Sequence, residues 1–196
     1  MIVLSGLCHK NRIWRDSIDN HYYDGMHGSA NQDNINMVED IADKNRCVLV
    51  IGLDGLRSDA LKKSWENRKT PAIDRLIQKG SYNFNTQANS NHTWSATGWA
   101  TVHTGVWMNK HGVTSNSWSG SNFTKYPTLM KRAEEYNPSL RTLSIVQWAP
   151  INDKLVEGID MERNMTTDEG VTTEIIKELD GSNSNDRSMV CFLTIF

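Results

Sequence analysis

The chain has 196 residues, of which 38% are hydrophobic and 22% charged, and its formal net charge is -2. This length suits one sizeable domain or part of a larger one. Charges of both signs are mixed along the chain, without a basic run or an acidic tail, so nothing here predicts a nucleic-acid-binding surface. No segment reaches the roughly 18 apolar residues of a membrane span. No signal peptide is recognisable either, so we expect a cytoplasmic protein.

The beginning of the chain is polar and rich in Asn and Asp, without sustained periodicity. We therefore predict an N-terminal extension over residues 1–45, followed by a folded domain over residues 46–196. His21 and His27 flank Asp24, but nothing holds these three groups together, which favours a solvated segment over a metal site. The three cysteines lie far apart and form no CxxC pair, which argues against a disulfide framework or a zinc knuckle.

The ordered part begins with an apolar, β-branched run over residues 47–53, which is typical of a strand buried on both faces of a parallel sheet. A short helix is predicted from Arg57. The next helix has a capping Thr70, Pro71 at its first position and Gly80 at its end.

Further along, helices and strands continue to alternate. After an extended segment over 81–87, the pattern predicts a helix following Ser95, a helix from Pro127, a strand over 140–148, a helix before Gly181 and a strand over 188–196. Strands that alternate with helices predict an α/β sandwich with a mainly parallel sheet. Because the chain ends inside its last strand, we expect the domain to be truncated at the C-terminus.

Asp54 is the first candidate for chemistry. It follows the first buried strand directly, and ligands of doubly wound sheets gather outside the carboxyl ends of the strands. Its carboxylate is suited to bind a divalent cation or to cap the helix that follows, and the sequence leaves both roles open.

Ser95 is the second candidate. Ala96, Trp99, Ala100 and His103 follow it at helical spacing, which predicts that Ser95 is the N-cap of a helix. A hydroxyl at that end lies beside free backbone N–H groups, where a phosphoryl group can bind. Taken alone, plain capping is the simpler interpretation.

Four ordered segments carry a resemblance to a known family: VLVIGLDGLRSDAL, TPAIDRLIQKG, SATGWATVHTGVWMNKHGVTSN and WAPIND. Together they resemble the N-terminal half of the alkaline phosphatase superfamily, and within it the type I phosphodiesterase/nucleotide pyrophosphatase family. The resemblance covers about residues 46–155. It implies an alkaline-phosphatase-like three-layer sandwich.

The resemblance also implies roles for particular residues. Asp54 matches a metal ligand. Ser95, nine residues before Thr104, matches the Ser or Thr that serves as nucleophile and metal ligand. Asn116 and the backbone N–H of Ala96 match groups that contact the substrate phosphate. The histidine of the His111-Gly112 pair matches a residue that shapes a turn.

Two divalent metal ions are implied as cofactors, with zinc as the expected ion and manganese or magnesium as alternatives. Four of the family's six metal-binding side chains come from a D-x-x-D-H-x-G-H type of motif, which this sequence lacks. The implied reaction is hydrolysis of a small phosphorylated substrate, with nucleotides as candidates, through a phosphoseryl intermediate. Thr97 and Trp99 break the signature that sulfatases need for formylglycine formation, which argues against sulfatase chemistry.

Two alternatives stay open at this point. The chain can be a non-catalytic remnant that binds phosphorylated ligands or a partner, since most of the metal ligands are absent from it. It can also be a related phosphatase or phosphomutase, which shares the nucleophile but acts on another substrate. The sequence does not distinguish a preference for diesters from one for monoesters.

Overall fold

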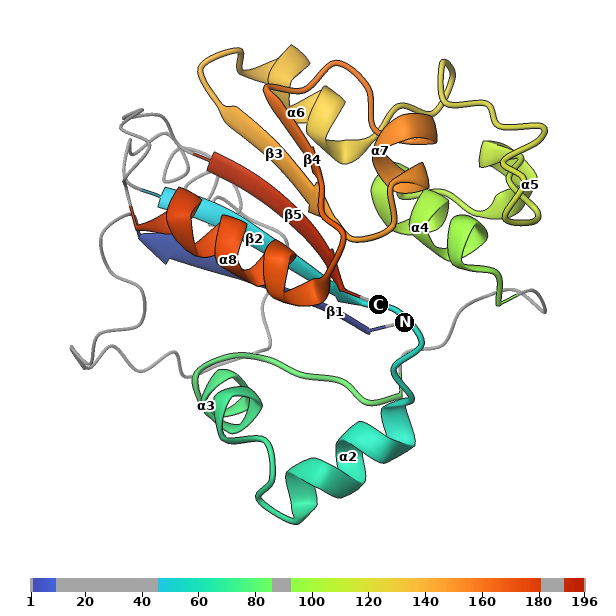
Figure 1. Ribbon diagram of the computed structural model, residues 1–196. Helices are drawn as coiled ribbons and strands as arrows, with labels where there is room; N and C mark the ends of the chain where they lie inside the picture. Colours follow the sequence, from blue (N-terminus) through green and yellow to red (C-terminus); the bar gives the residue numbers. More distant parts are fainter. Residues whose placement is uncertain (1, 10–45, 86–92, 181–188, 196) are drawn as a thin grey trace, which may run out of the picture.

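The structure is a computed structural model that describes residues 2–9, 46–85, 93–180 and 189–195 (Figure 1). The strands are β1 (Ile2–His9), β2 (Arg46–Leu53), β3 (Arg141–Val146), β4 (Met161–Asn164) and β5 (Met189–Ile195). The helices are α2 (Ser58–Glu66), α3 (Pro71–Lys79), α4 (Ser95–Thr104), α5 (Met108–His111), α6 (Leu129–Tyr136), α7 (Pro150–Lys154) and α8 (Asp168–Leu179). Among the described residues, no helix is long and apolar enough to cross a membrane.

The strands form one five-stranded sheet in the order β1-β2-β5-β3-β4. β2, β5, β3 and β4 are parallel, and β1 runs antiparallel along the outer edge of β2. The predicted α/β fold with a mainly parallel sheet is therefore confirmed. β1 was not predicted, and it lies within the segment interpreted as an N-terminal extension. An edge strand obtains its hydrogen bonds from a partner distant in sequence, which local pattern does not reveal.

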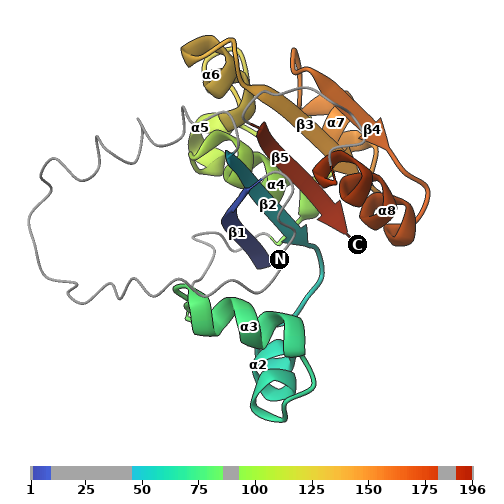
Figure 2. The same ribbon diagram turned by 90° about the vertical axis from the view of Figure 1, so that its left-hand side faces the viewer.

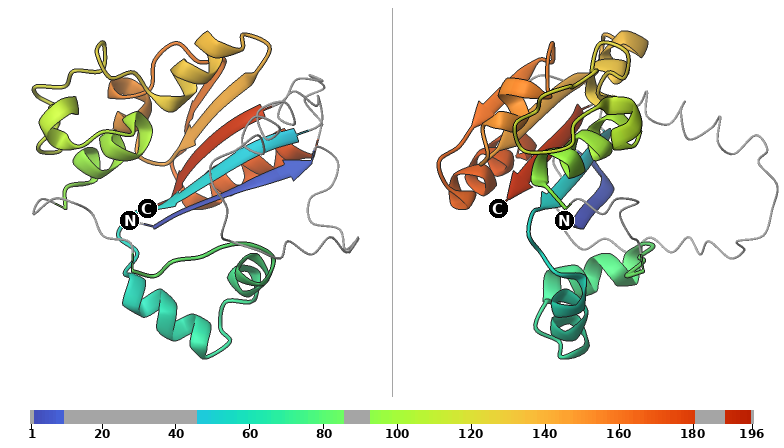
Figure 3. Two further views of the ribbon diagram at one scale, coloured as in Figure 1. Left: turned by 180° about the vertical axis from the view of Figure 1, so that it is seen from behind. Right: turned by 90° about the vertical axis from the view of Figure 1, so that its right-hand side faces the viewer.

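Two layers of helices cover the sheet, which explains why β2 is apolar after Arg46. Val48 and Val50 pack in the cluster beneath α4 and α6, whereas Leu49 and Ile51 pack in the cluster beneath α8. Successive side chains of a strand point to opposite faces, so both faces need apolar residues. The right-hand view of Figure 3 shows α8 on one side of the sheet and α4 on the other.

The helices that were predicted are present, with corrections at their first residues. α4 begins at Ser95 itself and its N-cap is Trp94, so the prediction that Ser95 is the N-cap is wrong. The helix predicted to begin at Pro127 is α6, which begins at Leu129. Its N-cap is Thr128, whose hydroxyl accepts the N–H of Lys131.

α2 and α3 lie next to each other and apart from the two helical layers (Figures 1 and 2). α3 has Pro71 at its start and ends at Gly80, as predicted. Thr70 occupies the N-cap position of α3, but its side chain makes no capping hydrogen bond, and its hydroxyl lies 3.3 Å from Asp74 Oδ1. The ring of Trp65 in α2 packs with the rings of Tyr82 and Phe84, which lie in the segment after α3.

A buried ion pair holds α8, on the face of the sheet opposite α4, against β3. Arg141 of β3 donates to Glu178 of α8 at 2.5 Å, and the side chains are only 10% and 2% exposed. The two charges compensate each other away from water, so removal of either one would leave the other buried and uncompensated. The pair therefore holds α8 in one position on β3.

His103 is a residue of the hydrophobic core. Its side chain is fully buried, its ring lies 3.9 Å from that of Phe192, and neither ring nitrogen has a hydrogen-bond partner among the described residues. Burial disfavours the charged imidazolium and lowers the pKa of His103 to about 3.

This burial predicts a pH-dependent stability. Below the unfolded-state pKa of about 6.5, the unfolded chain binds a proton at position 103 that the folded chain does not. The free energy of unfolding should therefore fall as pH drops from about 6.5 toward 3, by up to about 1.4 kcal/mol per pH unit from this group. Urea unfolding of wild type and of His103→Leu between about pH 6.5 and pH 3 measures this change in the free energy of unfolding. The variant should show a shallower slope, and equal slopes would contradict the assignment.

Candidate active site

Asp54 lies where the sequence analysis expected it, directly after β2 at the carboxyl edge of the parallel strands. Its side chain is half-buried. Oδ1 accepts the N–H of Gly55 at 2.8 Å, and Oδ2 accepts the indole N–H of Trp99 at 3.1 Å. α2 has Arg57 as its N-cap, so the alternative in which Asp54 caps that helix is wrong.

Ser95 is the first residue of α4, and its side chain is half-buried. Backbone N–H groups in the first turn of a helix have no partner within the helix, and the helix dipole makes this end positive. Ser95 is therefore presented at an end that favours anions. The bond between Trp99 and Asp54 brings this part of α4 to the end of β2.

Asn116 comes from the loop after α5, and its side chain is exposed. Its Oδ1 accepts the backbone N–H of Ala96 at 3.0 Å, a contact that spans 20 residues of sequence. Since the amide oxygen accepts this bond, the amide nitrogen is not needed for it and can donate to another group. The structure thus brings Ser95, Ala96 and Asn116 together, while the N–H of Ala96 is itself occupied by Asn116.

His111 holds the loop that carries Asn116. The side chain is buried, and its Nδ1 accepts the N–H of Val113 at 3.1 Å. The proton therefore belongs on Nε2, which lies 3.0 Å from Thr101 Oγ1, while that hydroxyl donates to the carbonyl of Thr97. Burial lowers the pKa of His111, in keeping with the neutral ring that these contacts need. The turn-shaping role that the resemblance implied agrees with this geometry.

Gly112, which follows His111, is required in this loop for a different reason. Gly112 has a φ of 78°, and a Cβ at this position would lie 2.0 Å from the carbonyl oxygen of Gly120. Glycine adopts this left-handed backbone without strain, and it has no side chain to clash with the carbonyl of Gly120. The loop can therefore fold back at this position.

Arg57 and Asp59 contact each other through an exposed ion pair. Two guanidinium nitrogens of Arg57 lie 3.0 and 2.6 Å from the Asp59 carboxylate oxygens, and both side chains are exposed. The hydrogen bond from Arg57 lowers the pKa of Asp59. His92, Asp24, His21 and His27 lie outside the described residues.

Trp99 is the residue at this edge that sequence reasoning missed. The sequence pattern placed Trp99 only within the predicted helix after Ser95, and in the structure its side chain is fully buried. The available signal was its position four residues after Ser95, together with Gly52, two residues before Asp54 on the same face of β2. The indole N–H needs an acceptor when it is buried, and Asp54 is that acceptor.

The carboxylate of Asp54 is a chemically suitable ligand for a divalent metal ion. Each carboxylate oxygen accepts one hydrogen bond from the protein, which leaves further lone pairs for a divalent cation. Ser95 supplies an oxygen at the same edge. Among residues 48–85, 93–180 and 189–195, no group of three or more His, Cys, Asp or Glu side chains gathers in a way that could hold a metal ion. Asp54 and Ser95 therefore fit part of a metal site.

These features define a class of protein: an α/β sandwich that presents a carboxylate, a serine hydroxyl and the amino end of a helix at the carboxyl edge of its parallel strands. The family model for type I phosphodiesterase / nucleotide pyrophosphatase matches residues 48–164, which is more than half of the 196-residue chain. The chain therefore belongs to this family, as its motifs predicted. At the coarse level, the family indicates a hydrolase of phosphoric esters. No match was found to a curated protein or to a solved structure.

The His111 network predicts a specific stability effect. Thr101→Val should leave the Nε2 proton of His111 without an acceptor and lower the free energy of unfolding by about 1–3 kcal/mol. Thr172→Val is a matched control, because the hydroxyls of both threonines donate to the carbonyl four residues earlier, but Thr172 is exposed. The control should change stability by less than about 0.5 kcal/mol. Urea unfolding followed by circular dichroism measures both, and equal small changes would contradict the network.

Proposed function

We propose that the protein is a metal-dependent phosphoric-ester hydrolase of the phosphodiesterase/nucleotide pyrophosphatase type, with Ser95 as its nucleophile. The observation that carries this proposal is the hydrogen bond from the Ala96 N–H to Asn116 Oδ1. It brings Asn116 to the amino end of α4 next to Ser95, and this end of a helix favours anions such as a phosphoryl group. Small phosphorylated molecules are the proposed substrates, with nucleotides as the first candidates.

Binding of the phosphoryl group rests on groups that are already in place. The first turn of α4 offers backbone N–H groups and the positive end of the helix dipole. The Nδ2 donors of Asn116 are suited to bind an equatorial phosphoryl oxygen. If Asn116 releases the Ala96 N–H when substrate binds, that N–H becomes a second donor. These donors stabilise charge that grows on the equatorial oxygens in the transition state.

Asp54 and Ser95 are the residues of this chain that would hold the metal ions, for which zinc is the expected element. When bound, such ions lower the pKa of a coordinated hydroxyl and neutralise phosphoryl charge. Asp54 is prepared for this role because its oxygens retain lone pairs after their bonds to Gly55 and Trp99.

The proposed reaction has two displacements. First, a bond forms between Ser95 Oγ, which loses its proton, and phosphorus, while the bond from phosphorus to the leaving-group oxygen breaks and that oxygen is protonated. Second, water adds to phosphorus, the bond to Ser95 Oγ breaks and the serine regains a proton. The products are an alcohol or phosphate ester and a phosphate or phosphomonoester.

One observation favours a second candidate function. The described residues hold no group of three or more metal-binding side chains. A non-catalytic protein that binds a phosphorylated ligand at the amino end of α4 needs only the N–H groups and Asn116. Both candidates predict binding of a phosphorylated ligand, and only the first predicts turnover.

Turnover of bis-p-nitrophenyl phosphate with added zinc tests the proposal. Ser95→Ala should lower kcat by at least about 1,000-fold, because it removes the nucleophile. Ser58→Ala is the matched control, since Ser58 is likewise the first residue of a helix but is exposed on α2, and it should keep wild-type turnover.

Other outcomes separate the candidates. Equal turnover in Ser95→Ala would remove Ser95 from its role. Absence of turnover by wild type, together with heat of binding on calorimetric addition of AMP, would favour the non-catalytic candidate. Comparison with p-nitrophenyl phosphate distinguishes preference for a diester from preference for a monoester.

A further inference from the structure

Trp118, in the loop after α5, is unusual in both its backbone and its side chain. Its φ is 59°, in the left-handed region that bulky residues rarely adopt. The side chain is 7% exposed, and its Nε1 has no hydrogen-bond partner among the described residues. A strained backbone and an unpaired buried polar atom are both unfavourable, so the surrounding structure must hold this residue in place.

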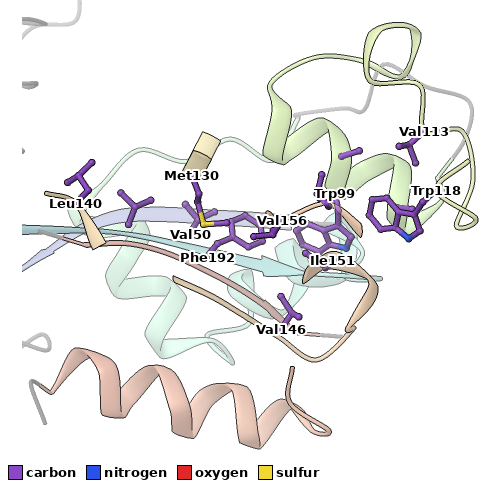
Figure 4. Packing of buried hydrophobic residues seen from close by; sticks show 14 residues of the cluster. Val50, Trp99, Val113, Trp118, Met130, Leu140, Val146, Ile151, Val156 and Phe192 are labelled. Carbon is purple, nitrogen blue, oxygen red and sulfur yellow. The ribbon is translucent and has the colours of Figure 1, made fainter. Parts of the chain in front are cut away.

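Aromatic rings provide the packing that holds Trp118. Its ring centroid lies 5.8 Å from that of Trp148, with 31° between the ring planes. The ring of Phe123 meets it edge-on, with 6.4 Å between the centroids. Figure 4 shows Trp118 in the core cluster, which also contains Val113 and Trp99. Ring pairs at such separations attract each other beyond the burial of their surface.

Trp148 is itself anchored to the sheet. It is the first residue of the WAPIND segment, to which the proposed function assigns no role. Asn152 of the same segment is buried, its Oδ1 accepts the hydroxyl of Ser144 in β3 at 2.6 Å, and its Nδ2 donates to the carbonyl of Arg163 in β4 at 3.2 Å. The segment is therefore fastened to two strands, which gives Trp118 a firm surface to pack on.

Trp118 also closes the turn that carries Asn116. Its backbone N–H donates to the carbonyl of Ser115 at 3.3 Å, so Asn116 occupies the first central position of a four-residue turn. From this position Asn116 Oδ1 accepts the N–H of Ala96 at the start of α4. A ring that is fixed against Trp148 thus fixes one end of the turn, and with it the point from which Asn116 reaches α4.

We propose that Trp118 is a positioning residue, whose contact with Trp148 holds Asn116 at the amino end of α4. The role of Asn116 in binding a phosphorylated ligand rests on the proposed function, whereas its contact with Ala96 does not. The left-handed backbone and the unpaired indole nitrogen are tolerated because a large ring is needed at this point of the loop.

Amide hydrogen exchange of the 196-residue chain tests the position of Asn116 directly. In wild type, Asn116 protects the Ala96 N–H, to which the first turn of the helix offers no partner. Trp118→Gly removes the ring and adopts the same φ without strain, so Ala96 should exchange about tenfold faster. Gly98 should keep its rate, because its N–H is bonded to the carbonyl of Trp94 and depends on α4 alone.

Three further variants define which property of Trp118 matters. Trp118→Phe keeps an aromatic ring and loses only a nitrogen without a partner among the described residues, so Ala96 should exchange close to the wild-type rate. Trp148→Leu removes the other ring of the pair and should accelerate exchange as Trp118→Gly does. Trp107→Ala is the matched control, since this loop tryptophan is 42% exposed, and it should leave the rate unchanged.

The outcomes separate positioning from a general contribution to stability. If Ala96 and Gly98 both exchange faster in Trp118→Gly, the ring stabilises α4 as a whole and the positioning role is wrong. If Trp118→Gly does not fold, Trp148→Leu decides by the same comparison of the two amides. An Ala96 rate that neither replacement changes would overturn the proposal.

Calorimetric addition of AMP distinguishes failure of this inference from failure of the proposed function. With both correct, wild type and Trp118→Phe bind AMP alike, and Trp118→Gly binds it about tenfold more weakly because Asn116 is misplaced. If wild type binds no AMP, the proposed role of Asn116 in ligand binding fails. Exchange of the Ala96 N–H then still decides whether Trp118 positions Asn116.

Discussion

The contact of a tryptophan ring with a glycine in a strand is the constraint on which this edge of the molecule depends. Trp99 occupies the space that a side chain at position 52 would fill, and a Cβ there would come within 2.1 Å of the ring. Because protein cores are closely packed, the ring is confined to this position. It therefore sets how closely α4 approaches β2, and its N–H reaches the carboxylate of Asp54 at the end of the strand.

The second part of the site depends on this helix position. Once α4 lies on the sheet, Thr101 faces His111, whose two ring nitrogens are both used in holding the following loop. That loop returns Asn116 to the first turn of α4, where it binds the N–H of Ala96. The loop and the first turn of α4 are thus held together by contacts within the chain.

Local sequence predicted the long elements well because their patterns are local. The apolar run of β2 and the helix predicted before Gly181, which is α8, are both present in the structure. β1, β4, α5 and α7 were missed. Three of these are short, and β1 depends on pairing with a strand far along the chain. Ser95 was predicted as the N-cap but is the first residue of the helix. The N-cap is Trp94, which has an extended backbone and makes no side-chain capping hydrogen bond, so residue type did not indicate it.

The sequence by itself determined the family, the parallel α/β fold and the candidates Asp54, Ser95, Ala96 and Asn116, because fixed spacings and strand-end positions are written along the chain. Only the tertiary structure decided that Asp54 does not cap α2, that His103 is a core residue and that Asn116 is bonded to Ala96. It alone also showed Trp99 bound to Asp54. These facts are distances between residues remote in sequence, and such distances are set by how helices pack on the sheet.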